Sequence, residues 1–288
     1  MPREFTLNKK SQMQQFAWIF SIIVGALILF FAFFFVSQYS KQIAIPTKQI
    51  TLEKSLDLLL EPFSAIGSLA EMRAEIIELP KDIYVEINCN EDYNEIKARE
   101  ISHKNFDITQ KVYEKYIFTK KINTKSKTKF FAFSLPIEIP FYVATATVIV
   151  TNDTCVSSLP YQYRENLKEI YDLVKDKVDT KIEFDCSTIN NPYIDFDGIA
   201  VAYLFSDLNN FDCNLDRILR RAINIAEIYK EKAMLMQAKG CNMKNVIYAL
   251  DNYINAIKNF KLNKQNFLSS INELNNANSE LSPECSLF

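Results

Sequence analysis

The stretch KFFAFSLPIEIPFYVATATVIV, residues 129–150, is the part of the chain that decides the fold class. It is rich in Phe, Ile, Val and Tyr, which are enriched in β-strands, and Pro136 and Pro140 interrupt it. This composition predicts two strands, 129–139 and 141–150. Strands this close along the chain are expected to lie in an antiparallel sheet.

Further strand-like segments lie on both sides of this stretch. On the N-terminal side they are EIIEL (75–79), DIYVEINC (82–89) and REISHKNFDI (99–108), and on the C-terminal side KIEFDC (181–186) and GIAVAYLF (198–205). A helical pattern near 162–178 separates the two groups. These segments predict an antiparallel sheet region.

The last quarter of the chain has the period of α-helices. Apolar residues recur at steps of four and three in two seams: Leu215, Leu219, Ala222, Ala226, Tyr229, Ala233 and Met236, then Val246, Leu250, Tyr253, Ile257, Phe260, Phe267, Ile271, Leu274 and Leu281. The second seam, 242–281, is either one continuous helix or two helices folded back near 261–264. The fold class is therefore α+β, with a C-terminal antiparallel helical hairpin or three-helix region.

Residues 16–36, FAWIFSIIVGALILFFAFFFV, contain no charged side chain. A helix of this length is about 31 Å long, which matches the hydrocarbon thickness of a bilayer. We therefore predict a cytoplasmic tail at 1–15, a transmembrane helix at 16–36 and a juxtamembrane helical stalk at 37–73. An extracytoplasmic α+β domain at 74–212 and a helical region at 213–288, packed on that domain, complete the organisation.

The direction of insertion is predicted from charge and from cysteine positions. Arg3, Lys9 and Lys10 precede the apolar segment, and basic residues favour the cytoplasmic side. Six cysteines all follow that segment, and an even number fits a domain exported to an oxidising compartment. They are Cys89, Cys155, Cys186, Cys213, Cys241 and Cys285.

Helix geometry links one cysteine pair to the C-terminal fold. A fold-back near 261–264 returns Cys285 to Cys241, whereas a continuous helix of about 60 Å separates them far beyond the roughly 7 Å limit for bridged Cα atoms. We favour the fold-back and a Cys241–Cys285 disulfide. The default pairs for the other four are then Cys186–Cys213 and Cys89–Cys155.

The segment Lys9-Lys10-Ser11-Gln12-Met13 resembles the archaeal prepilin-type (class III) signal, in which a basic pair and a small residue precede the cut. The resemblance implies processing between Ser11 and Gln12 and a filament role for the apolar helix. Phe16 occupies the fifth position after that cut, where many pilins carry Glu. The whole chain also looks like single-pass proteins of DPANN archaea, on Ile87-Asn88-Cys89, Ile139-Pro140-Phe141 and a cysteine near the C-terminus, and this likeness implies no activity.

The sequence offers little catalytic chemistry. Only four glycines occur, with no phosphate-binding loop among them, and no C-x-x-C motif is present, so we expect no cofactor and no metal. His103 is the single histidine, and on a strand its neighbour Ser102 would point to the opposite face. Asp195-Phe196-Asp197-Gly198 lacks EF-hand spacing and predicts a turn between strands. Asn152 begins the one Asn-x-Thr glycosylation triplet.

The expected function is that of a membrane-anchored, surface-displayed structural or interaction protein, not an enzyme. Its expected partners are the lipid bilayer and other envelope or filament proteins, met through the C-terminal helices. Because 30 basic and 34 acidic residues follow the tail, nucleic acid is not an expected partner. The alternatives are a pilin-like filament subunit and a membrane-anchored hydrolase that uses scattered carboxylates such as Asp153 or Glu183.

Overall fold

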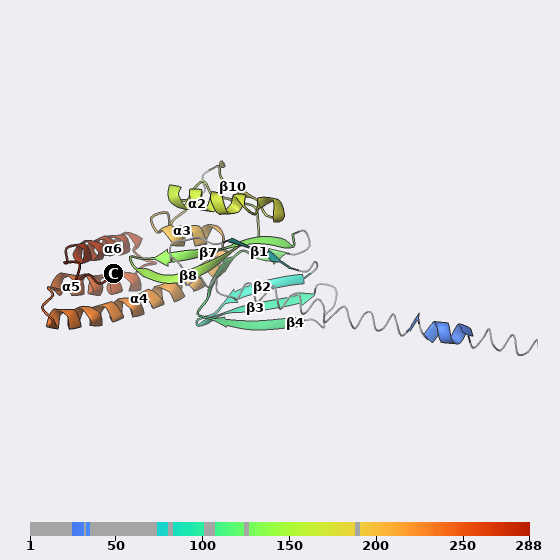
Figure 1. Cartoon of the computed structure of the whole chain (residues 1–288), viewed down its shortest axis with the longest axis horizontal. Coiled ribbons are helices and arrows are strands. Elements are labelled where there is room, and N and C mark those ends of the chain that lie inside the picture. The colour runs from blue at the N-terminus through green and yellow to red at the C-terminus, as the bar shows by residue number, and fades with distance from the viewer. Residues whose placement is uncertain are drawn as a thin grey trace, which may run out of the picture. The chain divides into compact units, whose positions relative to one another are not determined.

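The structure is a computed structural model that describes residues 25–31, 33–34, 74–79, 83–100, 107–123, 127–187 and 191–288 (Figure 1). The chain divides into two units, residues 1–53 and residues 54–288, and each is considered by itself.

The first unit is described only at 25–31 and 33–34, where the backbone is helical. The large apolar side chains there are more than half exposed: Leu27, Ile28, Leu29, Phe30, Phe31, Phe33 and Phe34. No helix in the described ranges has the length and apolar character needed to cross a membrane. Most of the predicted span 16–36, together with the tail 1–15, the stalk 37–73 and the Ser11–Gln12 processing site, lies outside the described residues, so these stay predictions.

Two four-stranded sheets form the first half of the second unit. One has the strand order β1-β7-β8-β5, and the other has the order β4-β3-β2-β6. The strands of the first sheet are β1 (Ala74–Glu78), β5 (Tyr116–Thr119), β7 (Lys129–Glu138) and β8 (Tyr142–Val150); those of the second are β2 (Ile83–Cys89), β3 (Tyr93–Glu100), β4 (Asp107–Tyr113) and β6 (Ile122–Asn123). A short parallel pair, β9 (Thr154–Cys155) and β10 (Ile182–Glu183), lies apart from both sheets.

The predicted strands at 129–150 are confirmed and form the centre of the first sheet. β7 and β8 pair antiparallel, with Phe133 opposite Val148, and the chain passes between them through a cis Ile139–Pro140 bond. Both strands are nearly continuous apolar runs because both faces are covered. β5 pairs parallel to β8, so this sheet is not purely antiparallel.

Two helices pack near β7. In Figure 1, α2 (Tyr161–Asp172) and α3 (Asp197–Leu204) lie on the same side of the β7–β8 pair. Phe131 on β7 meets Tyr171 of α2 edge to face, and Phe133 meets Phe205 at the end of α3 in the same way. The helix predicted at 162–178 is therefore present but shorter, and it is followed by a 3₁₀ turn, Lys175–Lys177.

The prediction of a strand at GIAVAYLF was wrong, because residues 197–204 form α3. Six of the eight residues of α3 are buried, so the helix has no continuous polar face to show the 3.6-residue period. The turn predicted at 195–198 therefore leads into a helix rather than a strand. The strand predicted at KIEFDC is reduced to the two residues of β10.

Gly198 allows α3 to approach β7 closely. A Cβ built on Gly198 would lie 2.7 Å from the main-chain oxygen of Pro136 and 2.9 Å from Cδ1 of Ile137. We expect Gly198→Ala to lower the free energy of unfolding by about 1–2 kcal/mol, because the overpacking outweighs the gain in helix propensity. Pulse proteolysis of the full chain in urea measures this change.

Gly25 supplies the control for this substitution. Nothing lies within 4 Å of a Cβ built there and its φ is not positive, so Gly25→Ala should change the stability of residues 54–288 by less than about 0.5 kcal/mol. If Gly198→Ala were as stable as the wild type, the contact between α3 and β7 would not be tight.

The C-terminal region consists of three helices, α4 (Leu208–Ala238), α5 (Lys244–Lys258) and α6 (Lys264–Ser279). The predicted fold-back is confirmed, since α5 ends at Lys258 and Asn263 caps α6 by accepting the Asn266 N–H. α4 also packs on the sheets through its first half, so the boundary predicted at residue 213 falls inside this helix. Figure 1 shows α4 running from the sheets to α5 and α6.

All six cysteines form disulfides, and one of the three expected pairs is confirmed. Cys241 is bonded to Cys285, with Cα atoms 5.9 Å apart, as the fold-back predicted. The other two predicted pairs, Cys186–Cys213 and Cys89–Cys155, were wrong.

The actual pairs are Cys89–Cys213 and Cys155–Cys186. Cys89 ends β2 beside α4, and the β9–β10 pairing places Cys155 opposite Glu183, three residues before Cys186. Sequence proximity could not indicate the Cys89–Cys213 pair, which is 124 residues apart and is created by the docking of α4. Cys155 and Cys186 are only 31 residues apart, and the β9–β10 pairing brings them together.

Candidate functional site

A row of buried polar side chains on α4 forms hydrogen bonds with main-chain groups on the open edge of β5. Asn210, Asn214 and Arg217 are 8%, 0% and 6% exposed, and their spacing of four and three places them on one helix face. Asn210 Oδ1 accepts the Thr119 N–H at 3.3 Å, and Asn214 Nδ2 donates to the Ile117 carbonyl at 3.0 Å. We call these three residues the polar row.

The polar row also joins α4 to the start of β3 and to the turn before it. Asn94 Nδ2 donates to Asn214 Oδ1 at 3.3 Å, and Arg217 donates to the Asp92 carbonyl at 3.1 Å. The Arg217 guanidinium lies 5.1 Å from the centre of the Tyr116 ring, a cation–π distance, and burial lowers its pKa. The row therefore fixes where the first turn of α4 stands relative to β2 and β5.

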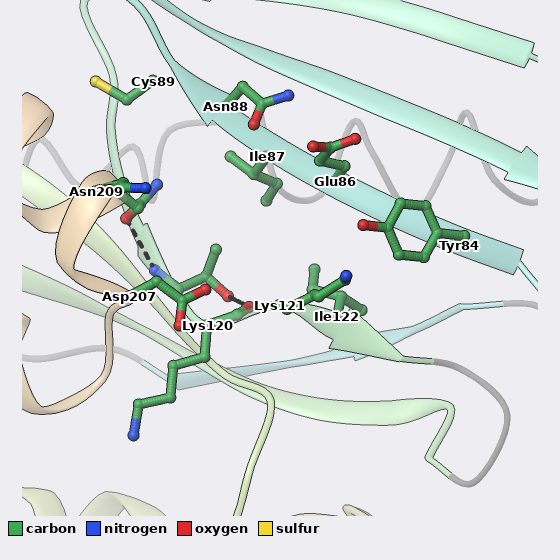
Figure 2. A pocket seen from close by; sticks show the side chains of 12 residues that line it. Tyr84, Glu86, Ile87, Asn88, Cys89, Lys120, Lys121, Ile122, Asp207 and Asn209 are labelled. Carbon is green, nitrogen blue, oxygen red and sulfur yellow. Dashed lines mark hydrogen bonds between the residues drawn. The ribbon is translucent and has the colours of Figure 1, made fainter.

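A cavity of about 260 Å³ lies between these elements, and we call it the polar pocket. Its walls come from β2, from the β5–β6 connection and from the start of α4 (Figure 2). The residues that line it are Tyr84, Glu86, Ile87, Asn88, Cys89, Thr119, Lys120, Lys121, Ile122, Asp207, Asn209 and Asn210.

The charges around the polar pocket balance, with two lysines and two carboxylates. Figure 2 shows Lys121 extending toward Tyr84, with Nζ 5.3 Å from the ring centre, and Lys120 extending away from β2. Burial lowers the pKa of Lys120, and the charge of Asp207 partly opposes that shift. A balanced lining suits a polar ligand that carries both hydrogen-bond donors and acceptors.

Asn210 provides a donor that has no partner. Its Nδ2 is buried and makes no hydrogen bond, although its Oδ1 is engaged by Thr119. A buried unpaired donor costs about 1–3 kcal/mol, so a ligand oxygen in the pocket that Asn210 lines would recover that energy.

The start of α4 contributes more donors. Asp207 is the N-cap residue, but its side chain makes no capping hydrogen bond. The first N–H groups of a helix have no partner within the helix, and here no cap side chain satisfies them. The wall formed by α4 is therefore rich in donors.

A second hollow is mainly apolar and has a volume of about 630 Å³. It lies between α4 and the α5–α6 turn, where Leu219, Ile223, Ile257 and Phe260 line it and Leu262 is 88% exposed. The ion pairs Arg220–Glu91 and Lys261–Asp216 lie among its lining residues.

The other sequence-predicted site residues do not gather at either hollow. Asn152 is exposed, whereas Thr154 of the same triplet is buried in β9 and donates to the Asn152 carbonyl at 3.0 Å. Asp197 begins α3 at an exposed position, and partial desolvation raises the pKa of its carboxyl. His103 lies outside the described residues.

Asp153, one of the two carboxylates considered for a hydrolase, does not have the surroundings of a general acid. Asp153 accepts from Lys127 Nζ at 2.6 Å and from the Lys181 N–H at 2.8 Å, and these bonds hold its pKa below the usual range. A general acid needs the opposite shift. In the described part of the chain, no group of three or more His, Cys, Asp and Glu side chains could hold a metal ion.

Sequence reasoning missed the polar pocket, although one signal was available. The polar row interrupts an otherwise apolar helix face at positions 210, 214 and 217, and polar side chains on such a face indicate buried hydrogen bonding. Comparisons with protein-family models, curated proteins and solved structures found no match to this chain.

Proposed function

We propose that this chain is a membrane-anchored, surface-displayed interaction protein without catalytic activity, whose domain binds its partners outside the cell. The observation that carries the proposal is the pairing of all six cysteines in three disulfides. Disulfides persist in oxidising compartments, and the uncharged segment 16–36 precedes every one of these cysteines. In this proposal the tail 1–15 is cytoplasmic and the apolar segment anchors the protein in the bilayer.

The outer surface of the C-terminal helices supports an interaction role. Ile228, Met234 and Leu235 of α4 are 63%, 49% and 68% exposed, and Tyr248 of α5 is 64% exposed. Ile228 and Leu235 are seven residues apart and share one face of α4, and exposed apolar side chains on one helix face are a feature of surfaces that meet other proteins. In the proposal, these helices contact neighbouring envelope proteins.

Disulfide mapping in native membranes tests the proposal. Cells are alkylated before lysis, and the membrane fraction is digested without reduction. We expect peptides joined as Cys89–Cys213, Cys155–Cys186 and Cys241–Cys285, and we expect protease added to intact cells to remove the domain. Alkylated, unpaired cysteines throughout, or a domain cleaved only after the cells are broken, would refute the extracytoplasmic placement.

A pilin-like filament subunit is the second candidate, and the Lys9-Lys10-Ser11-Gln12 segment is the observation that favours it. N-terminal sequencing of the protein from membranes separates the two functions. A mature chain that begins at Gln12 supports the filament role, whereas an intact Met1 supports the uncleaved anchor.

A further inference from the structure

β2 has an edge without a partner strand beside the polar pocket. β3 pairs with β2 from Ile83 to Cys89, but β6 covers the other edge only at Tyr84 and Val85. Among the described strands, none pairs with Glu86–Cys89 on that side. These four residues, about 13 Å of strand, line the pocket.

The pairing pattern shows which main-chain groups face the pocket. The Asn90 N–H donates to the Tyr93 carbonyl at 2.8 Å across the β2–β3 turn. Hydrogen-bonded and non-hydrogen-bonded pairs alternate along an antiparallel ladder. Asn88 and Glu86, two and four residues before Asn90, therefore direct their main-chain N–H and C=O groups toward β3. The N–H and C=O groups of Ile87 and Cys89 therefore face away from β3, toward the pocket.

We propose that the polar pocket binds an extended peptide segment of a partner protein, which adds to β2 as a strand beside Glu86–Cys89. Such a strand offers alternating N–H and C=O groups to Ile87 and Cys89. On its other side, a peptide carbonyl accepts from Asn210 Nδ2, the buried donor that has no partner. This inference specifies what kind of partner the proposed interaction protein binds. It rests on the proposed function only for the statement that the partner is met outside the cell.

The balanced charge of the pocket favours a peptide main chain over a free anion. The carboxylates of Glu86 and Asp207 line the pocket together with Lys120 and Lys121, so a ligand anion would meet repulsion as well as attraction. Peptide groups are neutral and carry one donor and one acceptor each, which matches the lining.

The test uses the full chain in detergent micelles and a phage-displayed library of random heptapeptides. Peptides are selected on the wild type after depletion on Ile87→Pro, which removes one N–H from the open edge and leaves the ladder to β3 intact. Each selected peptide is then synthesised in its natural form and with alternate residues N-methylated. We expect N-methylation of the peptide residues whose N–H groups face β2 to raise the dissociation constant at least tenfold, as measured by fluorescence anisotropy.

A second variant tests the inference without altering β2. Asn210→Asp keeps the acceptor for the Thr119 N–H but removes the unpartnered donor, and we expect it to weaken binding at least fivefold. Leu262→Asn, a change at the second hollow between α4 and the α5–α6 turn, is the matched control and should bind like the wild type. Failure to select any peptide that separates wild type from Ile87→Pro, or equal affinity of natural and N-methylated peptides, would overturn the inference. The outcome of these binding experiments does not affect disulfide mapping in cells, so the proposed extracytoplasmic placement is tested separately.

Discussion

Replacing Cys89 and Cys213 together with alanine should lower the free energy of unfolding by about 5 kcal/mol, the largest effect we expect of any disulfide in the chain. The bridge spans 124 residues, and cross-linking a longer loop removes more conformational entropy from the unfolded chain. It also ties the end of β2 to α4 at the wall of the polar pocket. Pulse proteolysis of the full chain in increasing urea measures the loss.

The Cys155–Cys186 bridge is the matched comparison. It spans only 31 residues, so its double alanine variant should lose about 1 kcal/mol less than the Cys89/Cys213 variant. An equal or larger loss at Cys155/Cys186 would show that loop length does not control the stabilisation. The Cys89/Cys213 variant should also lose binding of the selected heptapeptides, because the pocket wall is no longer held.

Asn214→Leu should lower the free energy of unfolding by about 3 kcal/mol, although the two side chains have the same branching at Cγ. Asn214 is 0% exposed, and its amide bonds to four groups: the Ile117 and Asn210 carbonyls, Asn94 and Arg217. Leucine leaves the Ile117 carbonyl and the Arg217 donor buried without this partner, and each such group costs about 1–3 kcal/mol. Urea-dependent pulse proteolysis again provides the measurement.

The same substitution on the outer face of the same helix is the control. Asn224 is exposed on α4, so Asn224→Leu should change stability by less than about 0.5 kcal/mol. The double variant Asn94→Ala/Asn214→Leu should lose less than the sum of the two single losses, because both residues belong to one network. Strict additivity would show that Asn94 and Asn214 act independently.

The elements that were predicted correctly have either a strand-like composition or a helical period. β7 and β8 are long β-branched and aromatic runs, and α4, α5 and α6 each bury one stripe. β3 was largely missed because Glu95, Lys97 and Arg99 dominate its composition, although Asn94, Ile96 and Ala98 alternate with them and are buried. α3 was taken for a strand because six of its eight residues are buried and leave no continuous polar face.

The candidate site could not be derived from the sequence because its residues come from three distant segments. Glu86 and Ile87 lie on β2, Lys120 follows β5, and Asp207 precedes α4. Local periodicity places a residue on a face of its own element, but it does not indicate which elements meet. The two incorrect disulfide pairs have the same cause, since α4 docks on a turn more than a hundred residues earlier in the chain.

The polar row has a consequence for the newly made protein. The main-chain groups of β5 at Ile117 and Thr119 are satisfied by side chains that lie 97 and 91 residues later in the chain. While the ribosome is still adding those residues, the β5 edge has no such cover and can pair with another nascent chain. The domain is therefore expected to need protection by a chaperone, or separation from its copies, until α4 has been translated.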